Sequence, residues 1–216
     1  GQIARAKGDL GLTEGKLEMH HTGAAGHYYG AYLVNGMELR LTGSVADSAF
    51  TAAYGGKLVI RQAEGQTGLT VVGNAFGYGA RGGWAFIAGR AGNRFGVCFR
   101  KNPEGGGPTV VVEGVESNAF QYMTGGVAVV LGPTGFNLGA GMTGGKVYLL
   151  EADLANLNPD YVHAIALDES DLALVQDLIQ RHIVETGSEI AKKALSKVSS
   201  EHFVKVVTKL LPESLE

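Results

Sequence analysis

Apolar and polar residues follow a repeat along this chain that is built on pairs of adjacent glycines. Each pair precedes a short apolar run of the kind that forms buried strands. Four stretches align on this pattern: Ala53–Ile60 (AYGGKLVI), Ala80–Ile87 (ARGGWAFI), Met123–Val130 (MTGGVAVV) and Met142–Leu149 (MTGGKVYL). Because glycine adopts positive φ without steric cost, the first glycine of each pair is expected to form a sharp corner. These glycines are Gly55, Gly82, Gly125 and Gly144.

A polar side chain stands seven or eight residues before each glycine pair. These residues are Asp47, Asn74, Asn118 and Asn137. Repeats on this scale are typical of solenoids, whose coils stack at about 4.8 Å and can align such side chains in ladders. The repeat predicts an all-β fold, a single-stranded parallel β-helix (solenoid) over residues 1–150. A further strand is expected at Asn93–Phe99, followed by a loop that bulges from its coil.

The tail, residues 151–216, has a different pattern, with apolar residues at helical spacing. These residues are Leu172, Val175, Leu178, Ile179 and Ile183. A cap at Asp168 or Ser170 and a stop at Gly187 predict the bounds of a helix. A second helix is expected from a cap at Ser188 to about Val198, and a short strand at His202–Val207. This short C-terminal α-helical tail is expected to pack on the β-helix and cover an open flank; a docking surface for another domain is the alternative.

Two glycine motifs have the G-x-G-x-x-G spacing of a dinucleotide-binding loop. They comprise Gly77, Gly79 and Gly82, and Gly139, Gly141 and Gly144. A nucleotide loop needs a helix after the glycines to hold the pyrophosphate, but strand-like apolar runs come after both motifs. The glycines are therefore predicted to be architectural, with no cofactor-binding residue and no bound cofactor.

The composition excludes several classes of protein. Glycine accounts for 34 of 216 residues, more than twice the usual share of about 7%, without the three-residue period of collagen. A net charge of −3 does not favour nucleic acid as a partner. No apolar run is long enough to cross a membrane, and the single cysteine is typical of a reducing compartment, so a cytoplasmic location is expected.

The residues capable of chemistry do not form a recognisable active site. The histidines His20, His21 and His27 are the only sequence cluster, without evident partners for a metal. Cys98 is expected to be a buried, inert thiol in a strand. The arginines Arg81, Arg90 and Arg94 lie near glycine corners, where they could meet phosphate, a corner carbonyl or a partner carboxylate. Glu113 and Glu116 are expected to be solvated. We therefore predict no catalytic, cofactor-binding or metal-binding residue.

Several segments resemble the C-terminal GXGXG domain of the glutamate synthase large subunit. They are GAAGHYYGAYLVNGMELRLTGSVAD, GRAGNRFGV, VVEGVESNAFQYMTGGVAVVLGPTGFNLGAGMTGGKVYLL, LIQRHIVETGSEIAKKAL and HFVKVV. The resemblance implies a right-handed β-helix. In that family, glutamine is hydrolysed in one domain and its ammonia is channelled to another, where 2-oxoglutarate is aminated and reduced with FMN and an iron–sulfur cluster. Those tasks need an N-terminal cysteine nucleophile, an FMN barrel and a cysteine cluster, none of which is expected in this chain, so the resemblance implies a structural domain only.

Three hypotheses about function are compatible with these observations. The first is a non-catalytic structural subunit or domain of a glutamate synthase, with the glutaminase and FMN synthase domains as partners. The second is a GXGXG scaffold in another redox or amidotransferase complex, similar to the GXGXG protein of formylmethanofuran dehydrogenase. The third is an autonomous β-helix binding protein. A homo-oligomer is compatible with each, and neither nucleic acid nor a membrane is expected as a partner.

Overall fold

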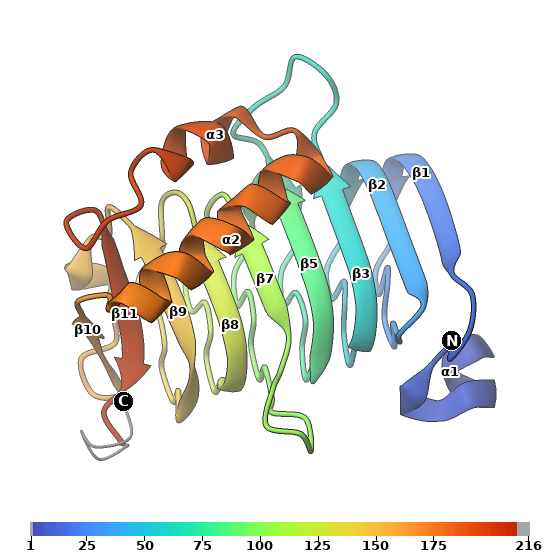
Figure 1. Cartoon of the computed structure of the whole chain (residues 1–216), viewed down its shortest axis with the longest axis horizontal. Coiled ribbons are helices and arrows are strands. Elements are labelled where there is room, and N and C mark those ends of the chain that lie inside the picture. Colours follow the sequence, from blue (N-terminus) through green and yellow to red (C-terminus); the bar gives the residue numbers. More distant parts are fainter. Residues whose placement is uncertain (1, 211–216) are drawn as a thin grey trace.

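The strands of the chain lie side by side in one long sheet, which a computed structural model describes over residues 2–210 (Figure 1). The strands are β1 (Leu17–Ala25), β2 (Met37–Val45), β3 (Tyr54–Arg61), β4 (Thr70–Val72), β5 (Gly82–Ala88), β6 (Arg90–Ala91), β7 (Thr109–Val112), β8 (Thr124–Val130), β9 (Gly144–Leu150), β10 (Val162–Ile165) and β11 (Phe203–Thr208). The α-helices are α1 (Gln2–Lys7), α2 (Glu169–Thr186) and α3 (Glu189–Leu195), and two 3₁₀ turns are η1 (Gly8–Leu10) and η2 (Leu154–Asn156).

Most strands pair in parallel, in the order β1, β2, β3, β5, β7, β8 and β9. All four glycine-pair stretches are among them, which confirms that the repeat forms parallel strands. The short strands β4 and β6 extend the sheet from β2, again in parallel. At the other end, β11 pairs antiparallel with β9, and β10 pairs antiparallel with β11.

Alternate residues of the parallel strands face two different hydrophobic cores. In β3, Leu58 and Ile60 belong to the core that lies between the strands and the turns behind them. Val59 lies between these two residues and faces the opposite core, which α2 and α3 cover. Both sides of the sheet are thus buried, which explains the near-continuous apolar runs of these strands.

Helix α2 crosses the sheet diagonally, from the β9 end toward β3 (Figure 1). Asp168 caps it in a reciprocal capping box with Asp171, and Gly187 ends it at φ 73°. Its buried face includes Val175, Leu178 and Ile179. These features confirm the helix predicted from the sequence, and Ser188 caps α3 as predicted.

The predicted fold class is wrong. Over residues 2–210, the chain forms a mixed sheet of eleven strands with three α-helices, so it is an α/β structure and not an all-β, single-stranded right-handed β-helix with a short helical tail. The physical reason is the size of the helical layer. Helix α2 is 18 residues long and shares a second core with the sheet. The antiparallel strands β10 and β11 then complete the sheet beyond β9.

The turns behind the strands contain six similar stretches, which we call the turn stretches. They span residues 28–33, 48–53, 75–80, 94–99, 118–123 and 137–142 within the described part of the chain. In every stretch, the first, third and fifth residues have positive φ. The N–H groups of these positive-φ residues point alternately to the next and the preceding stretch: Tyr122 donates to Ala140 at 2.9 Å and Phe120 donates to Phe95 at 2.6 Å.

Glycine occupies only some of these positive-φ positions. Phe50 has φ 61° and Phe120 has φ 58°, where Gly77 and Gly96 stand in the two intervening stretches. In these four stretches the second residue is alanine where the third is phenylalanine, and phenylalanine where the third is glycine. One of these two positions therefore always provides a ring to the core. Phe50, Phe76, Phe95 and Phe120 form a continuous series with centroid separations of 5.5, 4.8 and 5.8 Å.

Two local predictions need correction here. The residue with positive φ is the second glycine of each pair, as at Gly145 (φ 89°), and not the first, as at Gly144. At Gly126 (φ 99°) this conformation coincides with a β-bulge, since β8 has one residue more than β9 between their paired positions at this point. The predicted strand at Asn93–Phe99 is a turn stretch instead, because its alternating positive φ values are incompatible with an extended strand.

The expected polar ladders are present in two separate parts. In the first, the Asp47 carboxylate accepts from the N–H of Asn74 at 2.7 Å, and the Asn74 side chain accepts from the N–H of Asn93 at 2.9 Å. In the second, the side-chain amides of Asn118, Asn137 and Asn158 are joined by two hydrogen bonds of 2.7 Å. These bonds fix the spacing of successive turns.

Candidate functional site

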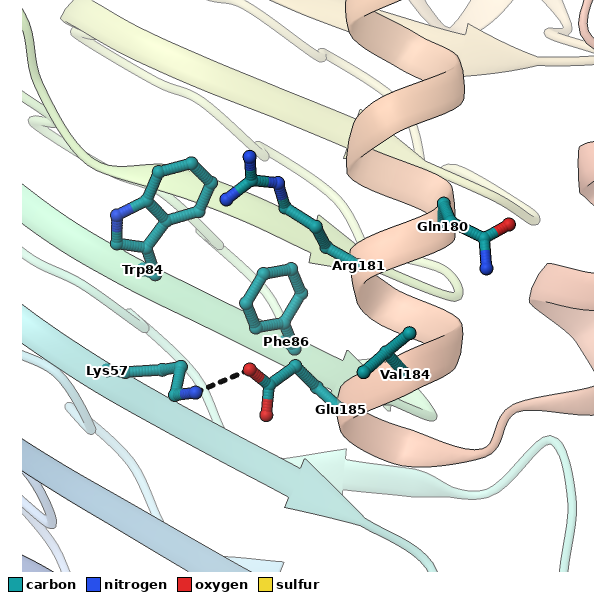
Figure 2. A pocket seen from close by; sticks show the side chains of 7 residues that line it. All are labelled: Lys57, Trp84, Phe86, Gln180, Arg181, Val184 and Glu185. Carbon is teal, nitrogen blue, oxygen red and sulfur yellow. Dashed lines mark hydrogen bonds and ion pairs between the residues drawn. The ribbon is translucent and has the colours of Figure 1, made fainter.

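A groove between α2 and strands β3 and β5 is a candidate site, with a volume of about 300 Å³. Its lining residues are Lys57, Trp84, Phe86, Gln180, Arg181, Val184 and Glu185 (Figure 2). The Arg181 guanidinium lies 5.2 Å from the ring centroid of Trp84, which is 37% exposed. Arg181 also forms an ion pair with Asp177 at 2.8 Å, so its charge is already compensated.

The acidic residue of this groove, Glu185, belongs to a cluster of ion pairs. Its carboxylate accepts hydrogen bonds from Arg40 on β2 and Lys57 on β3. Both cations also reach Glu38, which is 3% exposed and lies 2.5 Å from Lys16. Burial alone would raise the pKa of Glu38, but hydrogen bonds from Lys16 and Lys57 outweigh it and lower the pKa. The cluster therefore clamps the C-terminal end of α2 to the sheet.

The N-terminal end of α2 is held by a second polar contact. The Asp171 carboxylate accepts from the Tyr148 hydroxyl at 2.6 Å and from the Lys205 ammonium at 2.7 Å. Asp171 is 1% exposed and Lys205 is 3% exposed. Burial opposes the charge on Asp171, yet the hydrogen bonds from Lys205 and Tyr148 make its pKa lower than usual. Burial and the bond to Asp171 raise the pKa of Tyr148.

A third contact joins the end of β7 to the α2–α3 junction. The buried His182 places Nε2 3.4 Å from a carboxylate oxygen of Glu113, and the Ser188 hydroxyl donates to the same oxygen. In a catalytic Ser–His–acid triad the imidazole lies between the hydroxyl and the acid. Here the Ser188 hydroxyl and the His182 imidazole both contact the acid, and the Ser188 oxygen also caps α3. The geometry is therefore that of a structural contact and not of a catalytic triad. Glu113 is 4% exposed, and the prediction that it is solvated is wrong.

The histidine cluster separates into two contacts on exposed surface. His20 Nε2 lies 2.8 Å from Glu18, and His21 Nδ1 lies 2.6 Å from the Tyr29 hydroxyl. The hydrogen bond from Lys16, followed by the one from His20, lowers the pKa of Glu18 to about 2. Within residues 2–210, no group of three or more His, Cys, Asp or Glu side chains is placed to hold a metal ion.

The remaining predicted residues are dispersed. Arg90 forms an ion pair with Glu116 at 2.7 Å, whereas Arg81 and Arg94 are exposed. Cys98 is partly exposed in a turn stretch with φ 57°, so the prediction of a buried thiol in a strand is wrong.

The two G-x-G-x-x-G motifs each lead into a strand. Strand β5 begins at Gly82 and strand β9 begins at Gly144, which confirms that a strand and not a helix comes after each motif. Their glycines at the third and fifth positions of turn stretches, such as Gly77 and Gly79, provide positive φ. Among the described helices, none combines the length and apolarity needed to span a bilayer.

Comparison with known proteins is consistent with this architecture of repeated glycine turns. A family profile described as the GXGXG motif matches residues 1–209. The chain belongs to the GXGXG family. Three glutamate synthases are similar to it: the glutamate synthase [NADPH] large chain of Bacillus subtilis, 36% identical over 96% of this chain; the chloroplastic ferredoxin-dependent glutamate synthase 2 of Arabidopsis thaliana, 38% identical over all of it; and the glutamate synthase [NADH] of Schizosaccharomyces pombe, 34% identical over all of it.

The GXGXG chain corresponds to a small part of each of these relatives. It covers 14% of the Bacillus subtilis protein, 13% of the Arabidopsis thaliana protein and 10% of the Schizosaccharomyces pombe protein. These matches confirm the resemblance to the GXGXG region of glutamate synthase large chains. In this member of the family, the turn stretches give the glycine spacing a physical meaning, because positions two residues apart share positive φ.

Sequence reasoning missed the residues that join the layers of this GXGXG fold. It did not single out Glu38, Tyr148, Asp171, Glu185 or Lys205. The alternation of residues along β9 nevertheless predicts which side of the sheet Tyr148 faces. Tyr148 alternates with Val147 and Leu149, which places its ring on the helix-facing side of β9. Its partner across that core, in contrast, is decided by how α2 lies on the sheet.

Proposed function

We propose that this chain is a non-catalytic structural domain or subunit of a glutamate synthase, which holds a glutaminase domain and an FMN synthase domain in position. The family membership and the three glutamate synthase relatives support this assignment. The single cysteine supports a reducing compartment such as the cytoplasm.

The observation that carries the proposal is the use of the buried polar side chains. Glu38, Glu113 and Asp171 are each at most 4% exposed, and each contacts residues of at least two separate elements. Their partners are serine, histidine, tyrosine or basic residues that lie in the joints between the helical layer and the sheet. Breaking such a buried contact leaves a charge without its partner, so these contacts favour one arrangement of the layers, and a fixed arrangement is the property a scaffold needs.

The test uses the native assembly that contains this chain, either as a segment of a longer protein or as a subunit. An affinity tag on the chain is used to purify the assembly from its native cell. We expect a glutaminase domain and FMN in stoichiometric amounts, together with formation of glutamate from glutamine and 2-oxoglutarate. Cys98→Ser and Trp84→Phe are then expected to leave kcat within about twofold, because the proposal assigns no reacting group to this chain.

Two results would contradict the proposal. An assembly without glutaminase and FMN would assign the chain to another redox complex or to an autonomous binding function. A loss of kcat of about a hundredfold in Cys98→Ser, with the assembly and its FMN content intact, would show that this chain contributes directly to catalysis.

A further inference from the structure

We propose that the outer face of three neighbouring turn stretches, together with the residues directly after them in the chain, is a docking surface for an acidic segment of a protein partner. This basic face comprises Arg81, Arg94, Arg100 and Lys101 with Tyr78 and Tyr122. The inference rests on the proposed function and deepens it, because it names the surface and the chemistry through which the domain would hold a neighbour.

The charge on the basic face is unbalanced. The segments 74–82, 93–102 and 117–125 contain its four cations and no aspartate or glutamate, although the whole chain has a net charge of −3. All four side chains are exposed. Within residues 2–210 none of them forms a side-chain hydrogen bond or ion pair, in contrast to Arg40, Lys57, Arg90 and Arg181, which all do.

The backbone holds two of these cations next to each other. The Arg100 N–H donates to Ala80 at 2.9 Å, and the Arg81 N–H donates to Ala53 at 2.7 Å, so both arginines occupy the same position in successive turns. Like charges at matching positions of neighbouring strands destabilise a sheet unless an anion lies between them. Two carboxylates from a partner would remove this repulsion and accept bidentate hydrogen bonds from the guanidinium groups.

The tyrosines add apolar contact area to the basic face. Tyr78 is 49% exposed and Tyr122 is 55% exposed. The Tyr122 ring lies over Gly141, where a side chain would overlap it. Tyrosine and arginine are enriched at protein interfaces, and a surface whose backbone is already held in place loses little entropy on binding.

The chemistry favours a protein segment over nucleic acid as the occupant. Arginine pairs bind carboxylates and phosphates alike. Nucleic acid, however, presents phosphates over a long distance and is repelled by a protein of net charge −3, whereas an acidic peptide segment contacts only the local patch. An acidic segment is also compatible with an assembly held together by protein contacts.

Cys98 is a built-in reporter at the centre of the basic face. Its N–H donates to Gln121 at 2.8 Å, which places it next to the stretch of Tyr122, and along the chain it lies between Arg94 and Arg100. It is partly exposed and is the single cysteine of the chain. An occupant of the basic face would therefore shield this thiol from an uncharged alkylating reagent such as iodoacetamide.

The experiment titrates the full chain with a short fluorescent oligoglutamate peptide at low salt and measures fluorescence anisotropy and the rate of Cys98 alkylation. We expect saturable binding that slows alkylation. The double variant Arg81→Glu/Arg100→Glu should weaken binding by about tenfold or more, since two attractive charges become repulsive. The control, Arg5→Glu/Lys7→Glu on the exposed helix α1, removes the same number of charges and should bind like the wild type. Circular dichroism checks that both variants are folded.

Three results would overturn this inference. They are the absence of peptide binding by the folded wild type, an equal loss of affinity in the α1 control, and tighter binding of single-stranded DNA of similar length than of the peptide. The last result would assign the basic face to nucleic acid. None of them depends on glutamate synthase subunits, so a failure here is distinguishable from a failure of the proposed function.

Discussion

Substitution of two glycines in one turn stretch separates the contribution of backbone strain to the free energy of unfolding from the contribution of packing. Gly77 has φ 71° and Gly79 has φ 68°, so an added side chain experiences nearly the same backbone strain at both positions. Their surroundings differ. A Cβ at Gly77 would overlap the Phe99 ring, which is fully buried beside the phenylalanine series, whereas nothing lies within 4 Å of a Cβ at Gly79.

The expected free energies of unfolding combine these two terms. Positive φ costs an alanine about 1–2 kcal/mol, and the loss of glycine from the unfolded chain returns about 0.4–1 kcal/mol. Gly79→Ala should therefore destabilise the fold by about 1 kcal/mol. Gly77→Ala adds overpacking, which costs about 1–3 kcal/mol, for a total of about 2–4 kcal/mol. For a chain of this length, each kcal/mol lowers Tm by about 2–4 °C.

Urea denaturation followed by circular dichroism measures both variants, with extrapolation to water at a common m value. Phe99→Leu provides a second check, because a smaller side chain relieves the overlap. In a double-mutant cycle, Phe99→Leu should recover about 0.5–2 kcal/mol in the Gly77→Ala background beyond additivity. Equal destabilisation by Gly77→Ala and Gly79→Ala, or strict additivity in the cycle, would refute the argument that Gly77 makes room for the Phe99 ring.

Two further predictions concern strain and buried charge. Ala75→Gly should stabilise the fold by about 0.5–1 kcal/mol, because Ala75 has φ 54° and glycine adopts this conformation without strain. The control Ala80→Gly, at a buried alanine without positive φ, should destabilise the fold. Thermal melts in which both variants shift Tm in the same direction would contradict this prediction. Asp171→Asn leaves the ammonium of Lys205 buried without its counter-charge and should cost about 3–5 kcal/mol at neutral pH, against less than about 0.5 kcal/mol for the exposed control Asp177→Asn. Because the pKa of Asp171 is lowered in the fold, its contribution is present above about pH 4 and is lost as the pH falls below that value, so urea titrations from pH 7 to pH 3 should show a smaller loss of stability in Asp171→Asn than in the wild type.

Local patterns in the sequence were sufficient to predict helices α2 and α3, strand β11 and the four strands that contain the glycine pairs. The bounds of α2 are set by Asp168 and Gly187, because capping depends on groups within one turn of the helix. The strands after the glycine pairs are indicated by short apolar runs bounded by residues that favour turns. The polar ladders were also predictable, because a repeat places Asn118 and Asn137 at equivalent positions.

The tertiary structure alone determined which residues have positive φ. Phe50, Phe120 and Cys98 do not favour this conformation, and their sequences indicate strands or buried positions. Hydrogen bonds to the stretches on either side impose it, and these bonds come from residues about 20 positions away in the chain. For the same reason Asn93–Phe99 has the apolar content of a strand and the conformation of a turn.

The sequence also did not predict how α2 lies across the sheet. Helical spacing indicates that α2 has a buried face, but not that it crosses the parallel strands and makes the fold α/β. Because α2 crosses the strands, Glu185 contacts Arg40 and Asp171 contacts Tyr148. The junction between α2 and α3 in turn buries Glu113 against Ser188. The two residues of each pair are at least 23 positions apart in the chain. Their charge or polarity alone is equally compatible with an exposed position. The free energy of such contacts depends on desolvation by a neighbouring layer, which exists only once the chain has folded.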